Sequence, residues 1–356
     1  MDRVRVELGE RSYDIFIGAG LLSQAAPHLK AAGVGNRGVI ITDSNVAPLY
    51  AGKLQEVLRG GGFAAEIVTV PAGESSKSMR QVNRLIDRLP ALGLDRKSFV
   101  IALGGGVVGD LAGFVAGIYL RGLAFVQMPT SLLAQVDSSV GGKTGVNLPQ
   151  GKNLVGVFYQ PRLVLADTGL LASLPDRELR SGYAEVIKHG AIYDAEFFNW
   201  LERAEKPAQD LVHVVRRCCE IKGDVVGKDE RESGLRAILN FGHTIGHAME
   251  ALSDYVGLLH GEAISIGMCC AAELSVRRGG LSRPEADRIR ASLAATGLPT
   301  KIGDRFNMSD LRAAMQLDKK NVAGKQRFVL LKRLGEAFVS DAVTDRDVEE
   351  VINVCR

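Results

Sequence analysis

Residues 98–122, SFVIALGGGVVGDLAGFVAGIYLRG, predict a buried strand, a glycine turn and a helix in direct succession. Gly104, Gly106 and Gly109 satisfy the spacing G-x-G-x-x-G, in which backbone amides and the amino end of a helix can hold a pyrophosphate. We therefore predict a dinucleotide site at this turn. The alternative is that the glycines only allow close packing of the helix, and the lack of an acidic residue about 20 positions later weakens the match.

Strand and helix signals alternate on both sides of this stretch. RGVIITDSN at 37–45, for example, is a buried strand that runs into polar residues. Such alternation predicts a parallel sheet with helices on both faces, and ligands bind where the carboxyl ends of its strands meet loops. We therefore expect Asp43, Asn45 and Glu74 to hold ribose hydroxyls, and Asp110 to lie on the nicotinamide side.

The pattern changes in the middle of the chain. Strand signals become sparse, and helical stretches such as 177–202 and 211–226 dominate. We therefore expect an α/β, Rossmann-like parallel-sheet domain that binds NAD at residues 1–172. A mostly helical domain that binds metal and substrate is expected at residues 173–356, and the cleft between two such domains is a common place for a site.

Composition excludes several classes of protein. With 356 residues, of which 46% are hydrophobic and 24% charged, the chain is long enough for two globular domains. Its formal net charge of +3 is too small to indicate nucleic-acid binding. No run of apolar residues would span a membrane, and the amino terminus lacks the apolar core of a signal peptide. The cysteines have no Cys-x-x-Cys spacing, so we expect reduced thiols in a cytoplasmic protein.

Residues 232–262, ESGLRAILNFGHTIGHAMEALSDYVGLLHGE, contain three of the six histidines, His243, His247 and His260. Imidazole is the commonest protein ligand of zinc, and a catalytic zinc ion usually has three protein ligands. His243 and His247 have the spacing of a zinc-protease helix, but the glutamate that would be the general base is missing, which disfavours a metalloprotease. The alternative is three histidines that only cap and pack; their grouping favours a metal or catalytic role.

Polar residues precede these histidines at helical spacing. If the segment is one continuous helix, these residues lie on one side of it. A polar face is either solvated or lines a pocket, and the apolar neighbours favour a pocket. The residues of this face are Glu232, Arg236, Asn240, His243 and His247.

A third stretch, VDSSVGGKTGVNLPQGKNLVGVFYQP at 136–161, is rich in glycine and predicts an anion-binding loop. Lys143 and Lys152 lie among the glycines, and Asn153 follows the second lysine. Ammonium groups and backbone amides together can form a phosphate cradle. The alternative for each lysine is a solvated surface charge.

Glu185 and Lys188 are three residues apart and so are neighbours on a predicted helix. Glu185 is a candidate carboxylate to complete a zinc site with two of the histidines. Further positive charges, which either face an anion or are solvated, are Arg121, Lys222, Arg236, Lys319 and Lys320. Together these residues predict an NAD-type cofactor, one divalent metal ion and a polyanionic, hydroxylated substrate.

The chain also resembles the 3-dehydroquinate synthase family, essentially from end to end. Ser131 departs from the pattern, because that family more often has threonine there. The resemblance implies an α/β amino domain that binds NAD, a helical domain that carries zinc or cobalt, and usually a homodimer. The blocks that carry it are TDSNV, PAGESSKS, GGGVVGDLAGFVA, PTSLLAQVDSSVGGKTGVN, GKNLVGVFYQP, LPDRELRSGYAEVIKHG, DERESGLRAILNFGHTIGHAME, LHGEAISIG and LDKKN.

The resemblance implies a role for each matching residue. The metal ligands would be Glu185, His243 and His260, while His247 would donate to the substrate phosphate. Arg121 would reach the phosphate across the dimer interface. The other residues around the substrate would be Asp137, Lys143, Asn153, Lys188, Lys222, Glu232, Arg236, Asn240 and one of Lys319 or Lys320.

We also expect a set of residues around the cofactor, at the glycine turn and at neighbouring strand ends. They are Asp43, Asn45, Glu74, Lys77, Gly105, Gly106, Val107, Val108, Gly109, Asp110, Thr130, Ser131, Lys143, Lys152, Leu170 and Ser173.

The activity that the resemblance implies belongs to the shikimate pathway of aromatic amino acid and chorismate biosynthesis. A phosphorylated sugar acid, 3-deoxy-D-arabino-heptulosonate 7-phosphate, would become 3-dehydroquinate and phosphate. The steps would be transient oxidation by NAD, phosphate elimination, re-reduction and intramolecular aldol closure, which makes the enzyme a lyase.

Three alternatives remain at this point. A zinc-dependent polyol or glycerol-phosphate dehydrogenase would leave NADH behind. Another sugar-phosphate cyclase would act on a substrate without the carboxylate that Arg236 and Asn240 are expected to bind. A non-catalytic NAD-sensing protein would be expected to have lost its metal ligands, whereas Glu185, His243 and His260 are all present.

Overall fold

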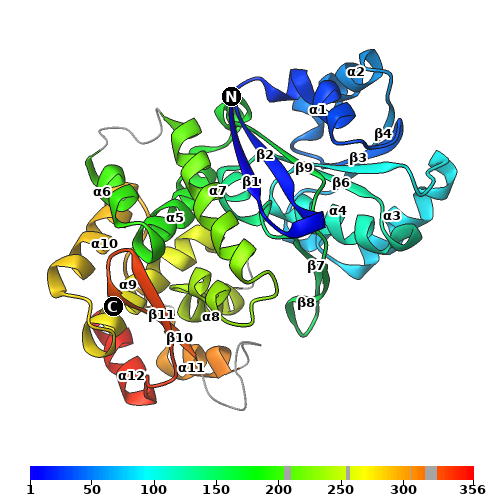
Figure 1. Ribbon diagram of the computed structural model, residues 1–356. Helices are drawn as coiled ribbons and strands as arrows, with labels where there is room; N and C mark the ends of the chain where they lie inside the picture. The colour runs from blue at the N-terminus through cyan, green and yellow to red at the C-terminus, as the bar shows by residue number, and fades with distance from the viewer. Residues whose placement is uncertain (204–209, 254–256, 305, 317–326) are drawn as a thin grey trace. The chain divides into compact units, whose positions relative to one another are not determined.

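The chain divides into two units in the computed structural model (Figure 1). Unit 1 comprises Met1–Leu174 and Asp210–Glu230, and unit 2 comprises Pro175–Gln209 and Arg231–Arg356. The residues that the structure describes are 1–203, 210–253, 257–304, 306–316 and 327–356. No helix among them is long and apolar enough to cross a membrane.

Unit 1 contains a seven-stranded sheet, which is parallel except for its first strand. The strand β5 is buried along its whole length, because both faces of the sheet are covered. The expected Rossmann-like parallel sheet is therefore confirmed. In spatial order the strands are β1 (Asp2–Val6), β2 (Tyr13–Gly18), β9 (Leu163–Asp167), β6 (Ala124–Pro129), β5 (Phe99–Gly104), β3 (Arg37–Asp43) and β4 (Ala64–Val70).

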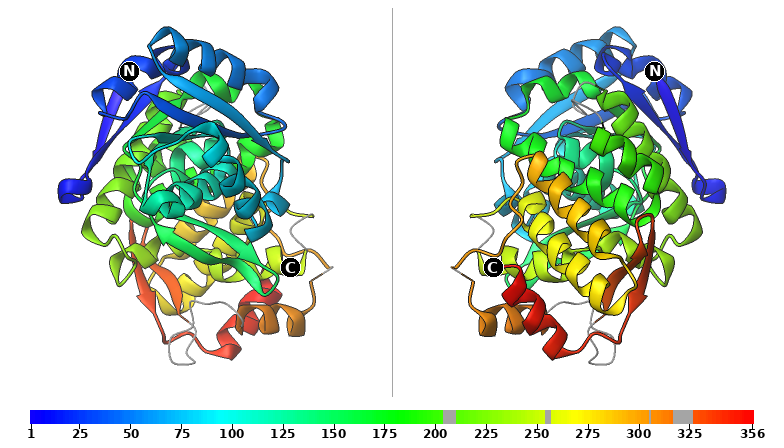
Figure 2. Two further views of the ribbon diagram at one scale, coloured as in Figure 1. Left: turned by 90° about the vertical axis from the view of Figure 1, so that its right-hand side faces the viewer. Right: turned by 90° about the vertical axis from the view of Figure 1, so that its left-hand side faces the viewer.

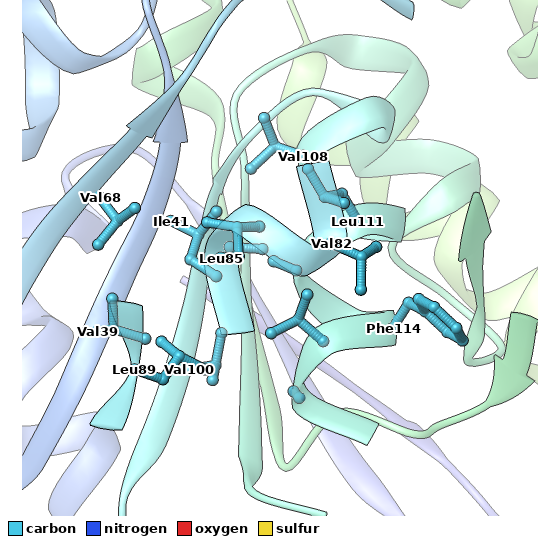
Figure 3. Packing of buried hydrophobic residues seen from close by; sticks show 14 of the residues in the cluster. Val39, Ile41, Val68, Val82, Leu85, Leu89, Val100, Val108, Leu111 and Phe114 are labelled. Atoms are coloured by element: carbon cyan, nitrogen blue, oxygen red, sulfur yellow. The ribbon is translucent and has the colours of Figure 1, made fainter. Parts of the chain in front are cut away.

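Alternate side chains of these strands enter two separate hydrophobic clusters. Val39 and Ile41 of β3 pack with α3 and α4 on one face, as the close view in Figure 3 shows. Ile40 packs with α1 and α2 on the other face. This is the two-residue period of a strand between two helical layers. The four helices are α1 (Ala25–Ala31), α2 (Gly52–Gly60), α3 (Met79–Arg88) and α4 (Gly106–Ile118).

One further helix, α7 (Leu211–Lys228), belongs to unit 1, although the sequence assigned its residues to the helical domain. Its buried side chains include Val214, Val215 and Cys218. This apolar stripe packs on β1 and β2, and α7 lies beside β1 in Figures 1 and 2. An apolar stripe predicts that a helix packs, but it does not identify the surface that it covers.

The predicted glycine-rich loop is in fact an antiparallel hairpin of β7 (Lys143–Leu148) and β8 (Gly151–Phe158). Thr144 and Val146, both on β7, are buried. Their two-residue spacing is a strand signal, which the surrounding glycines concealed. Lys143 and Lys152 therefore lie on paired strands and not in a free loop.

The described part of unit 2 is mostly helical, as expected, with one two-stranded sheet. The glycines of its helix α9 allow close backbone contacts with neighbouring segments. A Cβ atom on Gly261 would lie 1.9 Å from the carbonyl oxygen of Ser181 on α5. A Cβ atom on Gly267 would lie 2.0 Å from the carbonyl oxygen of Gly242. Its elements are α5 (Asp176–Tyr193), α6 (Ala195–Arg203), α8 (His243–Leu252), α9 (His260–Arg278), α10 (Arg283–Ala295), α11 (Met308–Gln316), β10 (Phe328–Arg333), β11 (Glu336–Ser340) and α12 (Asp345–Val354).

Short 3-10 or π turns connect the longer elements. They are η1 (Gly9–Arg11), η2 (Leu21–Gln24), η3 (Ala47–Ala51), η4 (Glu74–Ser76), η5 (Pro90–Leu92), η6 (Tyr119–Arg121), η7 (Ala134–Ser138), η8 (Thr168–Ser173) and η10 (Leu235–Asn240).

Candidate active site

The glycine turn lies between β5 and α4, as predicted. A Cβ atom on Gly104 would lie 2.7 Å from Val108 Cβ, so packing requires this glycine. One on Gly109 would lie 2.9 Å from Oε1 at the end of the Gln127 side chain, which would have to shift. Gly105 is different, because a Cβ atom there would meet nothing closer than Ser131 Oγ at 3.4 Å. The packing alternative therefore explains Gly104 but not Gly105. Because Gly105 has no side chain, it leaves the amino end of α4 uncovered.

The first turn of α4 presents the backbone amides of Gly106, Val107 and Val108, which have no partner inside the helix. These amides and the positive end of the helix dipole favour an anion. Two residues that follow β6 border the same turn. The backbone amide of Thr130 donates to Gly104 O at 3.0 Å, and Ser131 Oγ accepts from Ala134 N at 3.3 Å.

Beside this turn, Lys77 and Asp110 form an ion pair in which Lys77 is buried and Asp110 is partly buried. Burial raises the pKa of the Asp110 carboxyl above its ordinary value, and the positive charge of Lys77 opposes that rise. Glu74 lies close by, where its Oε1 accepts a hydrogen bond from Asn147 Nδ2 at 2.8 Å and lies 3.9 Å from Lys152 Nζ. Asn147 was not predicted from the sequence, since it looked like one polar residue among many.

Two more strand ends carry expected cofactor residues. Oδ1 of Asp43 accepts from the backbone amides of Asn45 and Val46, so this oxygen caps the turn after β3. Leu170 and Ser173 follow β9. The Tyr50 hydroxyl donates to Ser173 Oγ at 2.7 Å and lies 3.3 Å from Leu170 O. Because β3, β4, β5, β6 and β9 are parallel, their carboxyl ends share one edge of the sheet.

Lys222 on α7 is a buried cation at that edge of unit 1. Its Nζ donates to Asp137 Oδ1 at 2.7 Å and to Asp137 O at 2.6 Å. A buried ammonium group is stable only with such partners. Because α7 belongs to unit 1, Lys222 and Asp137, which are far apart in the sequence, lie together. Both are expected substrate residues.

Backbone strain occurs at three expected site residues. Arg121, Asn153 and Glu232 have φ angles of 67°, 55° and 60°. Side chains rarely adopt this left-handed conformation, which tends to persist at functional positions. For Asn153, the backbone amide donates to Asn147 Oδ1 at 2.9 Å, which holds the turn in place.

In unit 2 the predicted continuous helix from Glu232 to His247 does not exist. Residues 235–240 form the 3-10 helix η10, and α8 begins only at His243. The break occurs at Gly242, whose φ is 79° and where a Cβ atom would lie 2.6 Å from Met268 N. Asn240 and Glu232 still meet, because Asn240 Nδ2 donates to Glu232 Oε1 at 2.6 Å. Arg236 is buried, with 1% of its surface exposed.

A carboxylate and two imidazoles converge from three helices of unit 2. Glu185 is fully buried on α5, His243 is the first residue of α8 and His260 is the first residue of α9. Nε2 of each histidine lies 3.7 Å from Glu185 Oε1, and one ligand atom from each residue lies within 4.8 Å of the other two. In a tetrahedral zinc site with bonds of about 2.1 Å, ligand atoms are roughly 3.4 Å apart. The donor set and its spacing therefore fit a divalent ion.

Each of these histidines has an outer partner on Nδ1. His243 Nδ1 lies 3.1 Å from Phe241 O, and His260 Nδ1 lies 3.3 Å from Glu250 Oε2. Hydrogen bonds of this kind fix the tautomer with Nε2 available to a metal. Glu250 was not predicted from the sequence, although it lies three residues after His247 on α8 and so on the same side of that helix.

The two buried carboxylates favour positive charge at His260. Burial alone would lower the pKa of its imidazole, but Glu250 and Glu185 outweigh that effect and raise it to about 10. Either a proton on His260 or a divalent cation beside it would offset the negative charge of these two carboxylates. Lys188, also buried on α5, contacts the other oxygen of Glu185, Oε2.

His247 lies close to this cluster but with different neighbours. Its ring centre is 5.1 Å from that of His243, and its Nε2 is 4.0 Å from Glu250 Oε2. Lys319 and Lys320 lie outside the described residues. The remaining expected residues, Lys143 and Arg121, are exposed in unit 1.

A parallel-sheet unit with a glycine turn, together with a helical unit that carries a Glu-His-His cluster, places the chain among the sugar-phosphate cyclases. A solved 2-deoxy-scyllo-inosose synthase has a TM-score of 0.88 and 27% identity, with all of both chains covered. A solved 2-epi-5-epi-valiolone synthase from Streptomyces hygroscopicus has a TM-score of 0.88 and 32% identity over 98% of each chain. A protein described as a probable glycerol dehydrogenase from Sinorhizobium meliloti, at 19% identity and a TM-score of 0.65 over 96% of each chain, shares the fold alone.

Sequence comparison narrows this class to one family. Family models described as 3-dehydroquinate synthase N-terminal and C-terminal match residues 67–181 and 182–321. Proteins named 3-dehydroquinate synthase from Desulforamulus reducens and Thermodesulfovibrio yellowstonii are 48% and 47% identical over 99% of this chain and 100% of theirs. The chain belongs to the 3-dehydroquinate synthase family.

Proposed function

We propose that the chain converts 3-deoxy-D-arabino-heptulosonate 7-phosphate into 3-dehydroquinate and inorganic phosphate. The observation that carries this proposal is the convergence of Glu185, His243 and His260 in a chain that matches a 3-dehydroquinate synthase over 99% of its residues. Because the hydride acceptor is regenerated, the net reaction is that of a phosphorus-oxygen lyase.

We propose that Glu185, His243 and His260 hold Zn²⁺ or Co²⁺, and that the glycine turn before α4 holds NAD. The solved 2-deoxy-scyllo-inosose synthase contains NAD⁺ and Co²⁺, and the valiolone synthase contains NAD⁺ and Zn²⁺, which supports this choice. When bound, NAD accepts and later returns a hydride, while the ion polarises a substrate hydroxyl.

The substrate residues divide into two groups by chemistry. Arg236 is suited to the substrate carboxylate, because its planar guanidinium can form two parallel hydrogen bonds, and Lys222 and Asn240 assist it. Lys143, Asn153 and His247 are proposed to hold the phosphate. The remaining expected substrate residues, Asp137, Lys188, Glu232 and one of Lys319 or Lys320, complete the set.

Oxidation of a substrate carbinol to a ketone acidifies the neighbouring C–H bond. A phosphate oxygen can then take that proton while the C–O bond to phosphate breaks and a C=C bond forms. Lys143, Asn153 and His247 contribute by holding the phosphate in the orientation that this transfer needs. Glu232, fixed by Asn240, positions a water or relays the proton at the oxidised carbon. After re-reduction the ring opens, and the enolate attacks the ketone to close the carbocycle.

We also propose a cytoplasmic homodimer in which Arg121 reaches the phosphate bound by the partner subunit. Arg121 is exposed, its backbone is strained, and it forms no salt bridge within the described part of the chain. It is thus available to an anion brought by a second subunit.

The direct test is to incubate the protein with the heptulosonate phosphate, NAD and Zn²⁺ or Co²⁺. Phosphate and dehydroquinate should form in equal amounts without accumulation of NADH. Stoichiometric NADH would instead support a dehydrogenase, the activity of proteins that share only the fold. Turnover of a sugar phosphate that lacks the carboxylate would support another cyclase.

A further inference from the structure

We infer that Glu250 is a positioning residue, whose carboxylate holds His260 in the orientation that turns its Nε2 atom toward Glu185. This inference rests on the proposed function in one respect, which is that the cluster of Glu185, His243 and His260 takes a divalent ion. Nothing in the family resemblance assigned a role to Glu250.

The geometry of His260 carries the inference. One ring nitrogen, Nδ1, lies 3.3 Å from Glu250 Oε2, and the other, Nε2, lies 3.7 Å from Glu185 Oε1. An imidazole with an acceptor on each side has a defined ring plane and a defined tautomer once Nε2 binds a metal. Glu250 is therefore the group that makes Nε2, and not Nδ1, the donor atom toward the ion.

His243 provides an internal comparison. Its Nδ1 is satisfied by the main-chain oxygen of Phe241, which no substitution can remove. His260 depends on a side chain for the same function. The two histidines thus have the same distance of 3.7 Å from Nε2 to the same Glu185 oxygen, and they differ in the group that supports Nδ1.

The packing of α8 against α9 explains why Glu250 is in reach. A Cβ atom on Gly246 would lie 2.7 Å from Ile264 Cδ1 and 3.1 Å from Ala263 O, so the two helices approach closely at this glycine. Glu250, one helical turn further along α8, consequently lies beside the start of α9. It is 3% exposed, and a buried carboxylate is costly unless it has partners.

Glu250 Oε2 also lies 4.0 Å from His247 Nε2, which makes direct metal ligation by Glu250 the competing explanation. One ligand atom each from His247, Glu250 and His260 lies within the same 4.8 Å. The positions of the two Nε2 atoms beside Glu185 favour the positioning role, because they leave His260 Nδ1 to face Glu250 Oε2 at 3.3 Å. The two explanations differ in what removal of Glu250 does to metal stoichiometry.

The test compares Glu250→Gln and Glu250→Ala with the parent protein by Co²⁺ titration. The visible absorption bands report the ligand geometry, and competition with a chelator gives the dissociation constant. Glu250→Ala should still bind one ion per chain, with affinity about 10–100-fold weaker and shifted absorption bands. Glu250→Gln should be affected less, since its amide oxygen can still accept from Nδ1.

Glu273→Gln is the matched control. Glu273 is a buried carboxylate on α9 whose Oε1 lies 2.6 Å from Arg283 and 3.2 Å from Arg290, away from the cluster. Its substitution should leave Co²⁺ affinity and the absorption spectrum unchanged, which separates loss of a buried charge from loss of positioning.

Unchanged affinity in both Glu250 variants would overturn the inference, and so would complete loss of the ion, which would make Glu250 a ligand. If the parent protein itself bound no divalent ion, the proposed function would fail at its metal site. The two failures are therefore distinguishable.

Discussion

His260 Nε2 and Glu185 Oε1 lie 3.7 Å apart, although the two residues are on different helices. The distance suits two atoms that share a metal ion. Glu185 is fully buried, and Lys188 contacts its other oxygen, Oε2, so Oε1 is the oxygen that faces the histidines.

Glu185→Ala should therefore reduce bound metal from about one ion per chain to near zero, because two imidazoles without the carboxylate leave the site short of a third ligand. Mass-spectrometric metal analysis of the purified variant measures this. Glu202→Ala is the control. It removes a carboxylate on α6 that forms a salt bridge with Arg288 on α10, and the variant should retain metal. Unchanged stoichiometry in Glu185→Ala would exclude Glu185 as a ligand.

Two glycines with the same backbone conformation separate strain from steric overlap. Gly20 and Gly242 have φ angles of 80° and 79°, but a Cβ atom on Gly20 would meet nothing within 4 Å, whereas one on Gly242 would meet Met268 N at 2.6 Å. Gly20→Ala should cost about 1–2 kcal/mol, from backbone strain alone.

Gly242→Ala should cost more than Gly20→Ala and should also weaken Co²⁺ binding, since the clash displaces His243 at the start of α8. Urea unfolding and Co²⁺ titration of both variants provide the measurements. Equal stability losses, with Co²⁺ affinity intact, would contradict the steric argument.

The sequence predicted the sheet of unit 1 well, because parallel strands buried on both faces are continuous apolar runs such as Phe99–Gly104. It placed α7 wrongly, since an apolar stripe does not name its partner. It also suggested a helix through Gly242, where the glycine itself was the available signal for a break.

For the candidate metal site, local spacing favoured His243 and His247, which are one helical turn apart. In the structure, His243 and His260 are the two that face Glu185, because the helices that they begin pack closely at Gly242 and Gly267. Only the family resemblance had selected this pair, since a contact between two helix starts has no signature in residue spacing.

Lys222 and Asp137 offer a test that separates stability from activity. Lys222→Met removes a hydrogen bond to a charged group and should destabilise the protein by about 2 kcal/mol in urea unfolding. The double variant Lys222→Met with Asp137→Leu should recover part of that loss, because no carboxylate is then left without its partner.

Activity should not return in the double variant, because both residues are proposed to lie around the substrate. The phosphate-release assay checks this beside the unfolding measurement. Recovery of activity together with stability would mean that the pair is only structural.

Arg121 and Lys143 allow the proposed exchange between subunits to be tested in hybrid dimers. If Arg121 serves the partner's site, a dimer of one Arg121→Ala and one Lys143→Ala subunit has one intact site and one doubly defective site. Such hybrids, isolated with two different affinity tags, should show about half of the activity of the unsubstituted dimer. Each single variant alone should be inactive. A hybrid of Lys143→Ala with Lys222→Ala is the control and should remain inactive, because both of those residues are proposed to serve the site of their own subunit. No recovery in the first hybrid would place Arg121 at the site of its own chain.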